Sequence, residues 1–447
     1  MKSNLIIIGA GPGGYETAVL AAKQGLTVTI VEANKAGGAC LNEGCIPTKA
    51  FCKNASLLEE LKDAETFGLN GLSYSFDFSK VVERKNQVVD SLVKGIEFLL
   101  KNKLINYVQG QASFKDEKTI IVEDEEYTAD HIIIATGSVT KYLPIEGISL
   151  PNVITSKEIL DIDHIPERLC IIGAGVIGME FASIFNAFGS KVTVLEFMKD
   201  ILPNFDTDLS KRLKQVFTRK GIEIINQATV RKISQAGNSL AINYEQKGET
   251  KECVADTVLL AVGRAANVDS LNLADIGISF SSKGIETNEY LQTNIPHIYA
   301  IGDVNGKCLL AHAATFQGIK ALNHIIGKSD NINLDIMPSA VFTLPEVAMV
   351  GLTEEQCKER GIAYKAKKSF FRTNGKAVSM GETEGFCKLL VDDANKIIGC
   401  HLFGAHAADL IHEISALINK GATVSEYQDM IHAHPTLGEV VQECGRE

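Results

Sequence analysis

The chain has 447 residues, of which 45% are hydrophobic and 22% are charged, a composition typical of a globular protein with more than one domain. Its formal net charge is −11 and it has no run of lysines and arginines, which argues against nucleic acid and anionic membrane surfaces as partners. The sequence contains no uninterrupted apolar stretch long enough to span a bilayer, so we expect no membrane segment.

The start of the chain and its cysteines indicate a compartment. A short polar stretch is followed at once by a predicted buried strand, Leu5–Ile8, so we expect no secretory or transit peptide. Ten cysteines are too sparse for a secreted disulfide scaffold and show no paired Cys-x2-Cys zinc pattern, so we expect no metal site. These features favour the cytoplasm, where a disulfide is more often catalytic than structural.

A strand followed by a glycine-rich turn occurs twice. Each copy has the spacing Gly-x-Gly-x-x-Gly, with Gly9, Gly11 and Gly14 in the first and, 164 residues later, Gly173, Gly175 and Gly178 in the second. Each copy also has an acid 18 residues past the third glycine, at the end of the next predicted strand: Glu32 and Glu196. One such motif is weak evidence, but two in register indicate two dinucleotide-binding βαβ units. The glycines admit a pyrophosphate to the helix N-terminus, and the acid accepts hydrogen bonds from a ribose.

Two cysteines, Cys40 and Cys45, lie shortly after the first acid. Five residues of ideal helix rise about 7.5 Å, whereas the Cα atoms of a disulfide lie about 4.4–6.8 Å apart. The pair can therefore close only if the helix is distorted, and Pro47 is the expected cause. Two thiols that close can exchange two electrons with a flavin. The alternative interpretation is two ordinary buried thiols.

The first half of the repeat is longer than the second. From Glu32 to Gly137 there are 105 residues, but from Glu196 to Gly263 there are only 67. Most of the excess lies in residues 40–103, which contain the two cysteines and a predicted helix at about 78–103. We therefore expect the cysteines in an insertion beside the ligand of the first unit. Residues 104–131 and 222–257 alternate like antiparallel strands.

The pattern changes towards the C-terminus. An apolar strand at 298–301 ends in Gly302 and Asp303, and from about Met337 short strands at 341–342 and 387–391 and an amphipathic helix at 407–420 predict a separate α+β domain. Near the end, His434 is followed by Pro435 and, five residues on, by Glu439. A thiol must lose its proton to attack a disulfide, and the ordinary histidine pKa of about 6.5 suits a base for that step.

Together these motifs resemble the flavin-dependent disulfide reductases over essentially the whole chain, and within that family the enzymes that oxidise dihydrolipoyl groups. The most specific are the two glycine fingerprints and the segments Cys-Leu-Asn-Glu-Gly-Cys-Ile-Pro-Thr-Lys, Ala-Ile-Gly-Asp and His-Ala-His-Pro-Thr-Leu-Gly-Glu. The resemblance implies an α/β fold with two Rossmann-like domains, for FAD and NAD, plus a C-terminal α+β dimerisation domain. The expected parts are an FAD-binding domain with the cysteine insertion at 1–143, an NAD-binding domain at 144–266, a central segment completing the FAD domain at 267–336, and a dimerisation domain carrying the base at 337–447.

The resemblance also implies which residues hold the cofactors. FAD is expected on Gly9, Gly11, Gly14 and Glu32, with Asp303 reaching its ribitol chain, and NAD is expected on Gly173, Gly175, Gly178 and Glu196. Lys49, Gly137, Ala311 and Gly263 complete the expected cofactor-binding set. Glu196 favours a free 2′-hydroxyl and repels a 2′-phosphate, and no arginine follows it directly, so we expect NAD rather than NADP.

Catalytic roles follow from the same resemblance. Cys40 is expected to exchange with the substrate disulfide, and Cys45 to lie against the flavin as the charge-transfer thiolate. Lys49 is expected near the flavin N5 and paired with Glu180. His434 is the expected base, oriented by Glu439 and supplied by the partner subunit of a homodimer, whereas His432 is expected to be structural.

The expected reaction is the oxidation of dihydrolipoyl groups, on a carrier protein or on the acyltransferase of a 2-oxo acid dehydrogenase-type complex, with reduction of NAD+. Small departures from the family pattern are Ala39 where threonine is common and Thr48 where serine is common. Two alternatives use other substrates: another disulfide such as that of glutathione, or mercuric ion, although only Cys444 stands where a mercury-reducing relative has a cysteine pair. A third is a flavoprotein subunit with a mainly structural role in a large complex.

Overall fold

The computed structural model describes residues 2–446, which form two compact units. Unit 1 consists of the chain up to Ala50 together with Ser79–Tyr142 and Gly263–Leu334. Unit 2 consists of Phe51–Phe78, Leu143–Val262 and the chain from Asp335 onward. Across the described residues, the helices are all too short or too polar to cross a membrane.

Unit 1 is built on a seven-stranded sheet. Its strand order is β3 (Ile105–Gln109), β2 (Val28–Glu32), β1 (Lys2–Ile8), β6 (Glu125–Ile134), β5 (Thr119–Val122) and β4 (Ala112–Asp116), with β19 (Ile298–Ala300) also paired with β6. Strands β3, β2, β1, β6 and β19 are parallel, and β4, β5 and β6 form an antiparallel meander. Strand β2 is buried along its whole length, as expected where both faces of a parallel sheet are covered.

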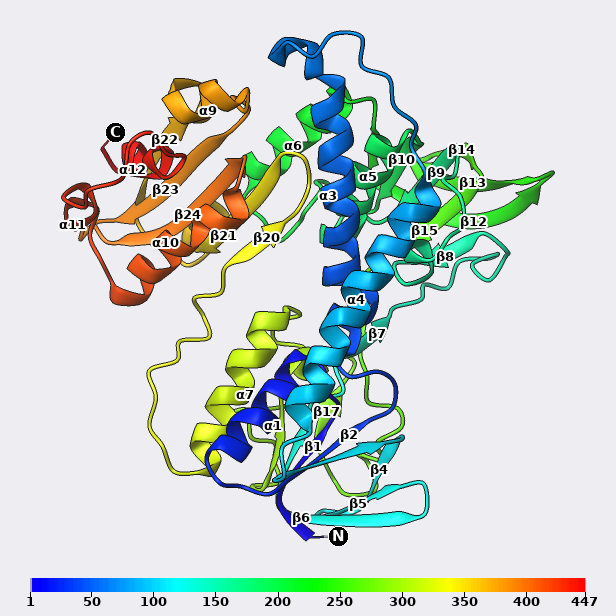
Figure 1. The fold of residues 1–447 in the computed structure, drawn as a ribbon, viewed down its shortest axis with the longest axis vertical. Coiled ribbons are helices and arrows are strands. Elements are labelled where there is room, and N and C mark those ends of the chain that lie inside the picture. The colour runs from blue at the N-terminus through cyan, green and yellow to red at the C-terminus, as the bar shows by residue number, and fades with distance from the viewer. Residues whose placement is uncertain (1, 447) are drawn as a thin grey trace. The chain divides into compact units, whose positions relative to one another are not determined.

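Helices cover this sheet. Helices α1 (Pro12–Lys23) and α7 (Ala311–Ile325) lie side by side (Figure 1) and share an apolar core with β1 and β2. Between β2 and β3 the chain forms α2 (Gly38–Glu43), α3 (Cys45–Lys62), η1 (Ala64–Phe67) and α4 (Phe78–Leu100). Helix α4 places Val89, Val93, Ile96 and Leu100 in the same core, at the spacing of one helical face.

Smaller elements complete unit 1. They are β7 (Ser138–Thr140), which pairs with β16 (Arg264–Ala266), then β17 (Phe280–Ser281), which pairs with β18 (Gly284–Ile285), and the short helix η3 (Gly302–Asn305) after β19. The β7–β16 ribbon follows the carboxyl end of β6. It therefore lies at the edge of the sheet where ligands bind in folds of this kind.

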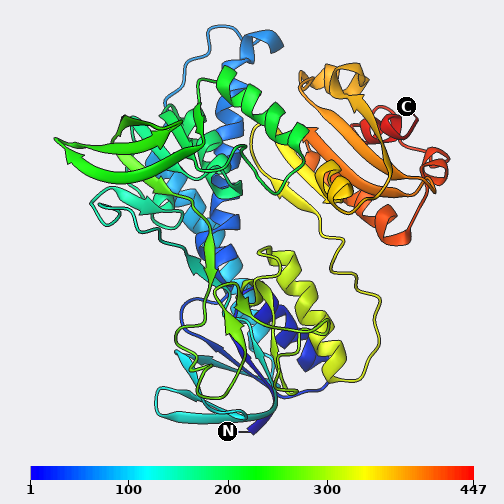
Figure 2. The same ribbon diagram turned by 180° about the vertical axis from the view of Figure 1, so that it is seen from behind.

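Unit 2 contains a second parallel sheet. Its order is β11 (Glu223–Asn226), β10 (Lys191–Glu196), β9 (Arg168–Ile172), β15 (Thr257–Leu260) and β8 (Val153–Thr155), with η2 (Glu158–Leu160), α5 (Val176–Phe188) and α6 (Thr207–Arg219) in the connections. The antiparallel strands β12 (Ala228–Ala236), β13 (Ser239–Gln246) and β14 (Glu249–Ala255), the green ribbon of Figure 2, form a separate sheet. One apolar core is shared by β9, β15 and this antiparallel sheet.

The C-terminal part of unit 2 is an antiparallel sheet with helices. The strand order is β20 (Ser339–Val341), β21 (Glu346–Gly351), β24 (Ile397–Gly404), β23 (Phe386–Asp392) and β22 (Tyr364–Phe370). The accompanying helices are α8 (Glu354–Glu359), η4 (Phe371–Thr373), α9 (Gly375–Met380), α10 (Ala407–Lys420), α11 (Val424–Gln428) and α12 (Gly438–Arg446). Helices α10 and α12 contribute Ile411, Ile414, Val440 and Val441 to its core.

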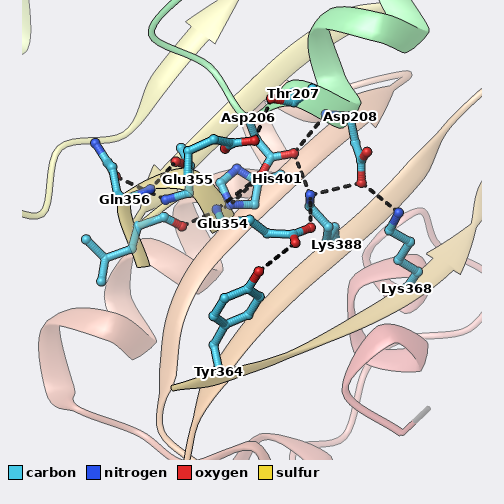
Figure 3. Close-up of polar contacts among 12 residues, drawn as sticks. Asp206, Thr207, Asp208, Glu354, Glu355, Gln356, Tyr364, Lys368, Lys388 and His401 are labelled. Atoms are coloured by element: carbon cyan, nitrogen blue, oxygen red, sulfur yellow. Dashed lines mark hydrogen bonds and ion pairs between the residues drawn. The ribbon is translucent and has the colours of Figure 1, made fainter. Parts of the chain in front are cut away.

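A buried ionic cluster joins helix α6 to this C-terminal sheet (Figure 3). The Lys388 side chain is 1% exposed, and its ammonium donates to Asp206 Oδ1 at 2.5 Å, to Glu354 Oε1 at 2.8 Å and to Asp208 Oδ2 at 2.9 Å. Lys368 binds the same Asp208 oxygen from the exposed side. Lys388, on strand β23, is thus bound to three acids. Asp206 and Asp208 lie at the N-terminus of α6, and Glu354 lies in α8.

Candidate active site

The two cysteines lie on either side of an interruption between two helices. Helix α2 ends at Glu43, Gly44 adopts φ −142° and ψ −108°, and α3 begins at Cys45. We expected Pro47 to distort the helix, but the interruption lies three residues earlier. Pro47 is the third residue of α3, where a helix has no partner for the backbone N–H in any case. The carbonyl of Gly44 begins the new helix by accepting from the Thr48 N–H at 3.1 Å and from its hydroxyl at 2.6 Å.

This arrangement brings the two sulfurs into hydrogen-bonding contact. Cys45 is exposed and Cys40 is partly buried. The hydrogen bond to Cys45, together with burial, raises the pKa of the Cys40 thiol well above its usual range, and the nearby Lys49 charge only partly opposes this. The Cys40 thiol therefore holds its proton more strongly than an ordinary cysteine does.

The cysteine segment packs against the first glycine turn. Gly37 donates its N–H to the Ala10 carbonyl at 2.8 Å. Gly38 has a φ of +61°, and a Cβ added there would lie 2.6 Å from the Cα of Gly11. Only glycine allows this approach, so the start of α2, the helix that carries Cys40, contacts the turn predicted to bind a dinucleotide.

The two glycine turns repeat each other closely. Gly9 and Gly173 have φ values of +107° and +106°, and a Cβ on either would meet the carbonyl oxygen of a neighbouring strand end, at 2.3 and 2.4 Å. A Cβ on Gly14 or Gly178 would lie 1.9 or 2.0 Å from the carbonyl oxygen of the first glycine of its own turn. In both units, therefore, helix and strand approach too closely for any side chain at the third glycine.

The turns fit a pyrophosphate. Among the residues that the structure describes, no side chain caps the N-terminus of α1 or α5, and no acid lies in the first turn of either helix. The first backbone N–H groups of each helix are thus left for an anion, which the helix dipole also favours. Around Gly175, a Cβ would meet no described heavy atom within 4 Å, which leaves room for a ligand to approach the backbone.

Each predicted acid is held beside its turn. The Glu32 carboxylate accepts from the Ala10 N–H at 2.7 Å and from the Asn34 N–H at 2.8 Å. Glu196 repeats this with Ala174 at 2.5 Å and Met198 at 2.6 Å. Both acids are largely buried, so their positions are fixed, and each carboxylate retains lone pairs that can accept from a ribose.

Four further predicted residues, Asp303, Gly137, Ala311 and Gly263, belong to unit 1. Asp303, in η3, accepts from the Ser138 hydroxyl at 2.5 Å, and that hydroxyl accepts from Arg264 Nε at 2.7 Å. Gly137 directly precedes Ser138 and has a φ of +69°, and Ala311 is the first residue of α7. Gly263, with a φ of +106°, immediately precedes Arg264.

Two residues that the sequence did not indicate, Ser138 and Arg264, position Asp303. Ser138 and Arg264 hold its carboxylate in a chain of hydrogen bonds although they are 165 and 39 residues away from it in sequence. The only local signal was that each follows a glycine at a strand end. That signal does not reveal the contact, which arises when β7 pairs with β16.

Glu180 lies in α5 of unit 2 and is 4% exposed. Its Oε1 accepts from the Phe342 N–H at 2.9 Å, a second role that the sequence did not indicate. Lys49 belongs to unit 1. The pairing of Lys49 with Glu180 therefore stays a prediction.

His434 and Glu439 are in contact in unit 2, as their spacing predicts. Nδ1 of His434 lies 3.0 Å from Glu439 Oε1, and the other carboxylate oxygen accepts from the Thr436 N–H at 2.9 Å. These two hydrogen bonds, that of Thr436 first, lower the pKa of Glu439. Because a carboxylate only accepts, Nδ1 must carry the proton, which leaves Nε2 of the neutral ring as the basic atom. The histidine side chain is 79% exposed and thus accessible to a substrate.

His432 has a different environment. Its side chain is 11% exposed, its Nε2 lies 2.9 Å from Glu413 Oε1, and its ring packs edge-on against Tyr427. These contacts match the structural role expected for it, and they make it a natural control for His434.

Comparisons with known proteins agree with this geometry. The pyridine nucleotide-disulphide oxidoreductase family matches residues 3–318, and the dimerisation domain of the same family matches residues 337–444. Proteins named dihydrolipoyl dehydrogenase are similar along their whole length. That of Staphylococcus aureus is 39% identical and covers 100% of this chain and 97% of its own, and that of Geobacillus stearothermophilus is 39% identical with 99% and 96% covered.

Among solved structures, the HOCl-induced flavoprotein disulfide reductase RclA from Escherichia coli, as its Cu(II) complex, has a TM-score of 0.90 at 29% identity, with 100% of this chain and 99% of that chain covered. These matches confirm three expectations: the α/β fold class, an enzyme of the disulfide oxidoreductase type, and FAD and NAD(H) as its cofactors. The domain boundaries and the roles of individual residues stay predictions. This chain belongs to the pyridine nucleotide-disulphide oxidoreductase family.

Proposed function

We propose that this protein is a dihydrolipoamide dehydrogenase that oxidises dihydrolipoyl groups and reduces NAD+. The observation that carries the proposal is the contact between the Cys40 and Cys45 sulfurs in a segment packed on the first glycine turn. The similarity of about 39% identity to bacterial dihydrolipoyl dehydrogenases over the full length supports the choice of substrate.

The reaction begins with a proton transfer. With Nδ1 held by Glu439, the Nε2 atom of His434 accepts a proton from one thiol of the reduced lipoyl group. The substrate thiolate then attacks the sulfur of Cys40 in the oxidised Cys40–Cys45 pair. The bond between the two cysteines breaks, and Cys45 leaves as a thiolate.

A second exchange completes the oxidation of the substrate. Its remaining thiol, after losing its proton, attacks the substrate sulfur bound to Cys40, so that oxidised lipoyl is released and Cys40 takes back a proton. The cysteine pair now holds two electrons. Bound FAD supplies the route by which these electrons leave the thiols, and NAD+ accepts them as a hydride, giving NADH and one proton overall. Because the substrate leaves before NAD+ is reduced, we expect ping-pong kinetics.

Residues of the glycine turns hold the two cofactors in this proposal. FAD is bound by Gly9, Gly11, Gly14, Glu32, Lys49, Gly137, Asp303 and Ala311 of unit 1. NAD is bound by Gly173, Gly175, Gly178 and Glu196 of unit 2, together with Gly263. Gly263 is the first residue of the last segment of unit 1. The Glu196 carboxylate, fixed by two backbone N–H groups, selects a nicotinamide cofactor without a 2′-phosphate.

The protein acts as a homodimer in this proposal, and each His434 serves the cysteines of the partner subunit. The match to the family's dimerisation domain at residues 337–444 supports this assembly. The natural substrate is a dihydrolipoyl group on a carrier protein or an acyltransferase of a 2-oxo acid dehydrogenase-type complex. A mixed dimer of Cys45→Ser and His434→Gln chains tests the sharing, because one of its two sites receives both native residues.

That mixed dimer should be far more active than either mutant homodimer, in which every site carries a defect. Activity no higher than that of the two parents would show that His434 acts within its own chain or is not the base.

The substrate is tested by a profile of kcat/KM with the purified flavoprotein. We expect kcat/KM for dihydrolipoamide with NAD+ to be orders of magnitude higher than kcat/KM for oxidised glutathione with NADH or NADPH. It should exceed kcat/KM for mercuric ion with NADPH by a similar margin. A higher value for glutathione or mercuric ion would overturn the substrate assignment but leave the family intact. Absence of turnover with every pair would favour a structural role.

A further inference from the structure

Unit 2 contains another pair of cysteines whose sulfurs are in contact, and one of the two lies close in sequence to the second glycine turn. Cys170 lies in β9, three residues before Gly173, and its sulfur is 3.8 Å from that of Cys253 in β14. The two strands belong to different sheets whose facing sides share one apolar core. The sulfurs therefore meet across the space between the parallel sheet and the antiparallel sheet.

The two cysteines differ in exposure. Cys170 is 1% exposed, whereas Cys253 is only partly buried. Cys253 is thus the more accessible residue of the pair to a small oxidant in solution, and the sulfur of Cys170 is already in contact with the one that would be oxidised.

We propose that Cys170 and Cys253 are a second oxidisable dithiol of this enzyme, a modification site for hydroperoxides that is separate from the Cys40–Cys45 pair. In the first step the thiolate of Cys253 attacks one oxygen of hydrogen peroxide, the O–O bond breaks, and Cys253 becomes a sulfenic acid as hydroxide leaves. In the second step the sulfur of Cys170 displaces the hydroxyl group from Cys253, which forms the disulfide. Two thiols lose two electrons, and one peroxide becomes two molecules of water.

The proton affinities of the pair agree with this order. The hydrogen bond between the two sulfurs lowers the pKa of Cys253, although burial and the acids Glu223 and Glu252 act against it. The same hydrogen bond, together with burial, raises the pKa of Cys170. The more exposed residue of the pair is thus also the one whose thiol loses its proton more readily, as an oxidation-sensitive cysteine requires.

A third group of cysteines in the same unit provides an internal control. The sulfurs of Cys387 and Cys400 lie 4.0 Å apart, at nearly the separation of the Cys170–Cys253 pair, and Cys444 adjoins them. All three are fully buried in the core of the C-terminal sheet. If contact between sulfurs were sufficient, this group would oxidise as readily, whereas the requirement for access predicts that it stays reduced.

The test uses the full-length holoenzyme, treated with hydrogen peroxide and then alkylated, digested and mapped by mass spectrometry. We expect a disulfide-linked pair of peptides containing Cys170 and Cys253, lost on treatment with dithiothreitol, while Cys387 and Cys400 remain alkylatable thiols after unfolding. The Cys40–Cys45 link in the same digest shows that disulfides survive the procedure. If that link is found and Cys253 is still a thiol, the proposal is wrong. Equal oxidation of Cys387 and Cys400 in the folded enzyme would overturn the argument from access.

Two variants separate the steps. In Cys170→Ser the resolving sulfur is absent, so Cys253 should accumulate as a sulfenic acid that dimedone traps. In Cys253→Ser we expect Cys170 to stay a thiol under the same treatment. Oxidation of Cys170 in the second variant at the rate found in the unmodified enzyme would show that Cys253 is not the residue that peroxide attacks. These readouts do not depend on the proposed substrate, so they distinguish a failure of this inference from a failure of the proposed function.

Discussion

The proton acceptor of the proposed reaction is one atom, Nε2 of His434. Replacing the ring by an amide in His434→Gln keeps a polar side chain but removes the base. We expect kcat/KM for dihydrolipoamide to fall by about 10²–10⁴-fold, the usual cost of losing a general base. The matched control is His432→Gln, which changes a histidine two residues away that contacts Glu413. Comparable losses in both variants would mean that the effect comes from a disturbed local structure rather than from proton transfer.

The two acids beside the glycine turns have equivalent positions but different expected ligands. In Glu196→Ala, the loss of charge-assisted hydrogen bonds worth about 1.5–3 kcal/mol should raise KM for NAD+ roughly 10–150-fold, and the preference for NAD+ over NADP+ should fall. Glu32→Ala should instead reduce the FAD content of the purified protein and leave the nucleotide preference unchanged. Steady-state kinetics with both nucleotides and a flavin assay check the pair. An unchanged preference in Glu196→Ala would contradict the assignment of NAD to the second unit.

At the scale of elements, two glycines of the second turn have different roles, because Gly178 is tightly packed whereas Gly175 has open space around it. A Cβ at Gly178 would lie 2.0 Å from the Gly173 carbonyl oxygen, so Gly178→Ala must force α5 away from β9. Overpacking of this kind costs about 1–3 kcal/mol, which should appear as a lower Tm. Gly175→Ala is the control, since its Cβ meets no described atom within 4 Å and its φ is −74°. It should keep the Tm of the unmodified protein but raise KM for NAD+. A lowered Tm in Gly175→Ala with normal KM would contradict this division.

The elements also show what the sequence could and could not predict. The two βαβ units follow from local patterns, because the strand, the three glycines and the acid at 18 residues are close together in the chain. The sequence predicts a distortion at Pro47, whereas the interruption lies at Gly44, three residues earlier. The chain from Arg264 through Ser138 to Asp303 joins segments distant in sequence, and no local pattern reveals such a contact.

At the scale of the whole molecule, the cluster around Lys388 holds α6 against the C-terminal sheet (Figure 3). Burial raises the pKa of Asp208, but the hydrogen bonds from Lys368 and Lys388 outweigh it and hold that pKa at about 2, below the ordinary 3.8. A depressed pKa stabilises the folded protein above the unfolded value. This contribution is therefore complete above pH 3.8 and is lost as the pH falls towards about 2.

Removing the central cation should be costly. Lys388→Met leaves the fully buried Asp206 without its ion pair, and breaking a buried pair by deleting one partner costs about 3–5 kcal/mol. Lys368→Met removes a cation that is 41% exposed, so we expect a cost of about 0–1 kcal/mol. Denaturant unfolding of both variants at neutral pH gives the two free energies. Equal effects would show that the buried position of Lys388 adds nothing to the stability of the protein.

The central claim is that electrons pass from a dithiol substrate through Cys40 and Cys45, with Cys45 as the thiolate next to bound FAD. The most direct measurement is the anaerobic absorption spectrum of the Cys40→Ser and Cys45→Ser holoenzymes before and after addition of dihydrolipoamide. We predict that Cys40→Ser shows long-wavelength absorbance without any reductant, because its Cys45 thiolate has no disulfide partner, and that Cys45→Ser never shows it. Identical spectra for the two variants at every stage would contradict the account.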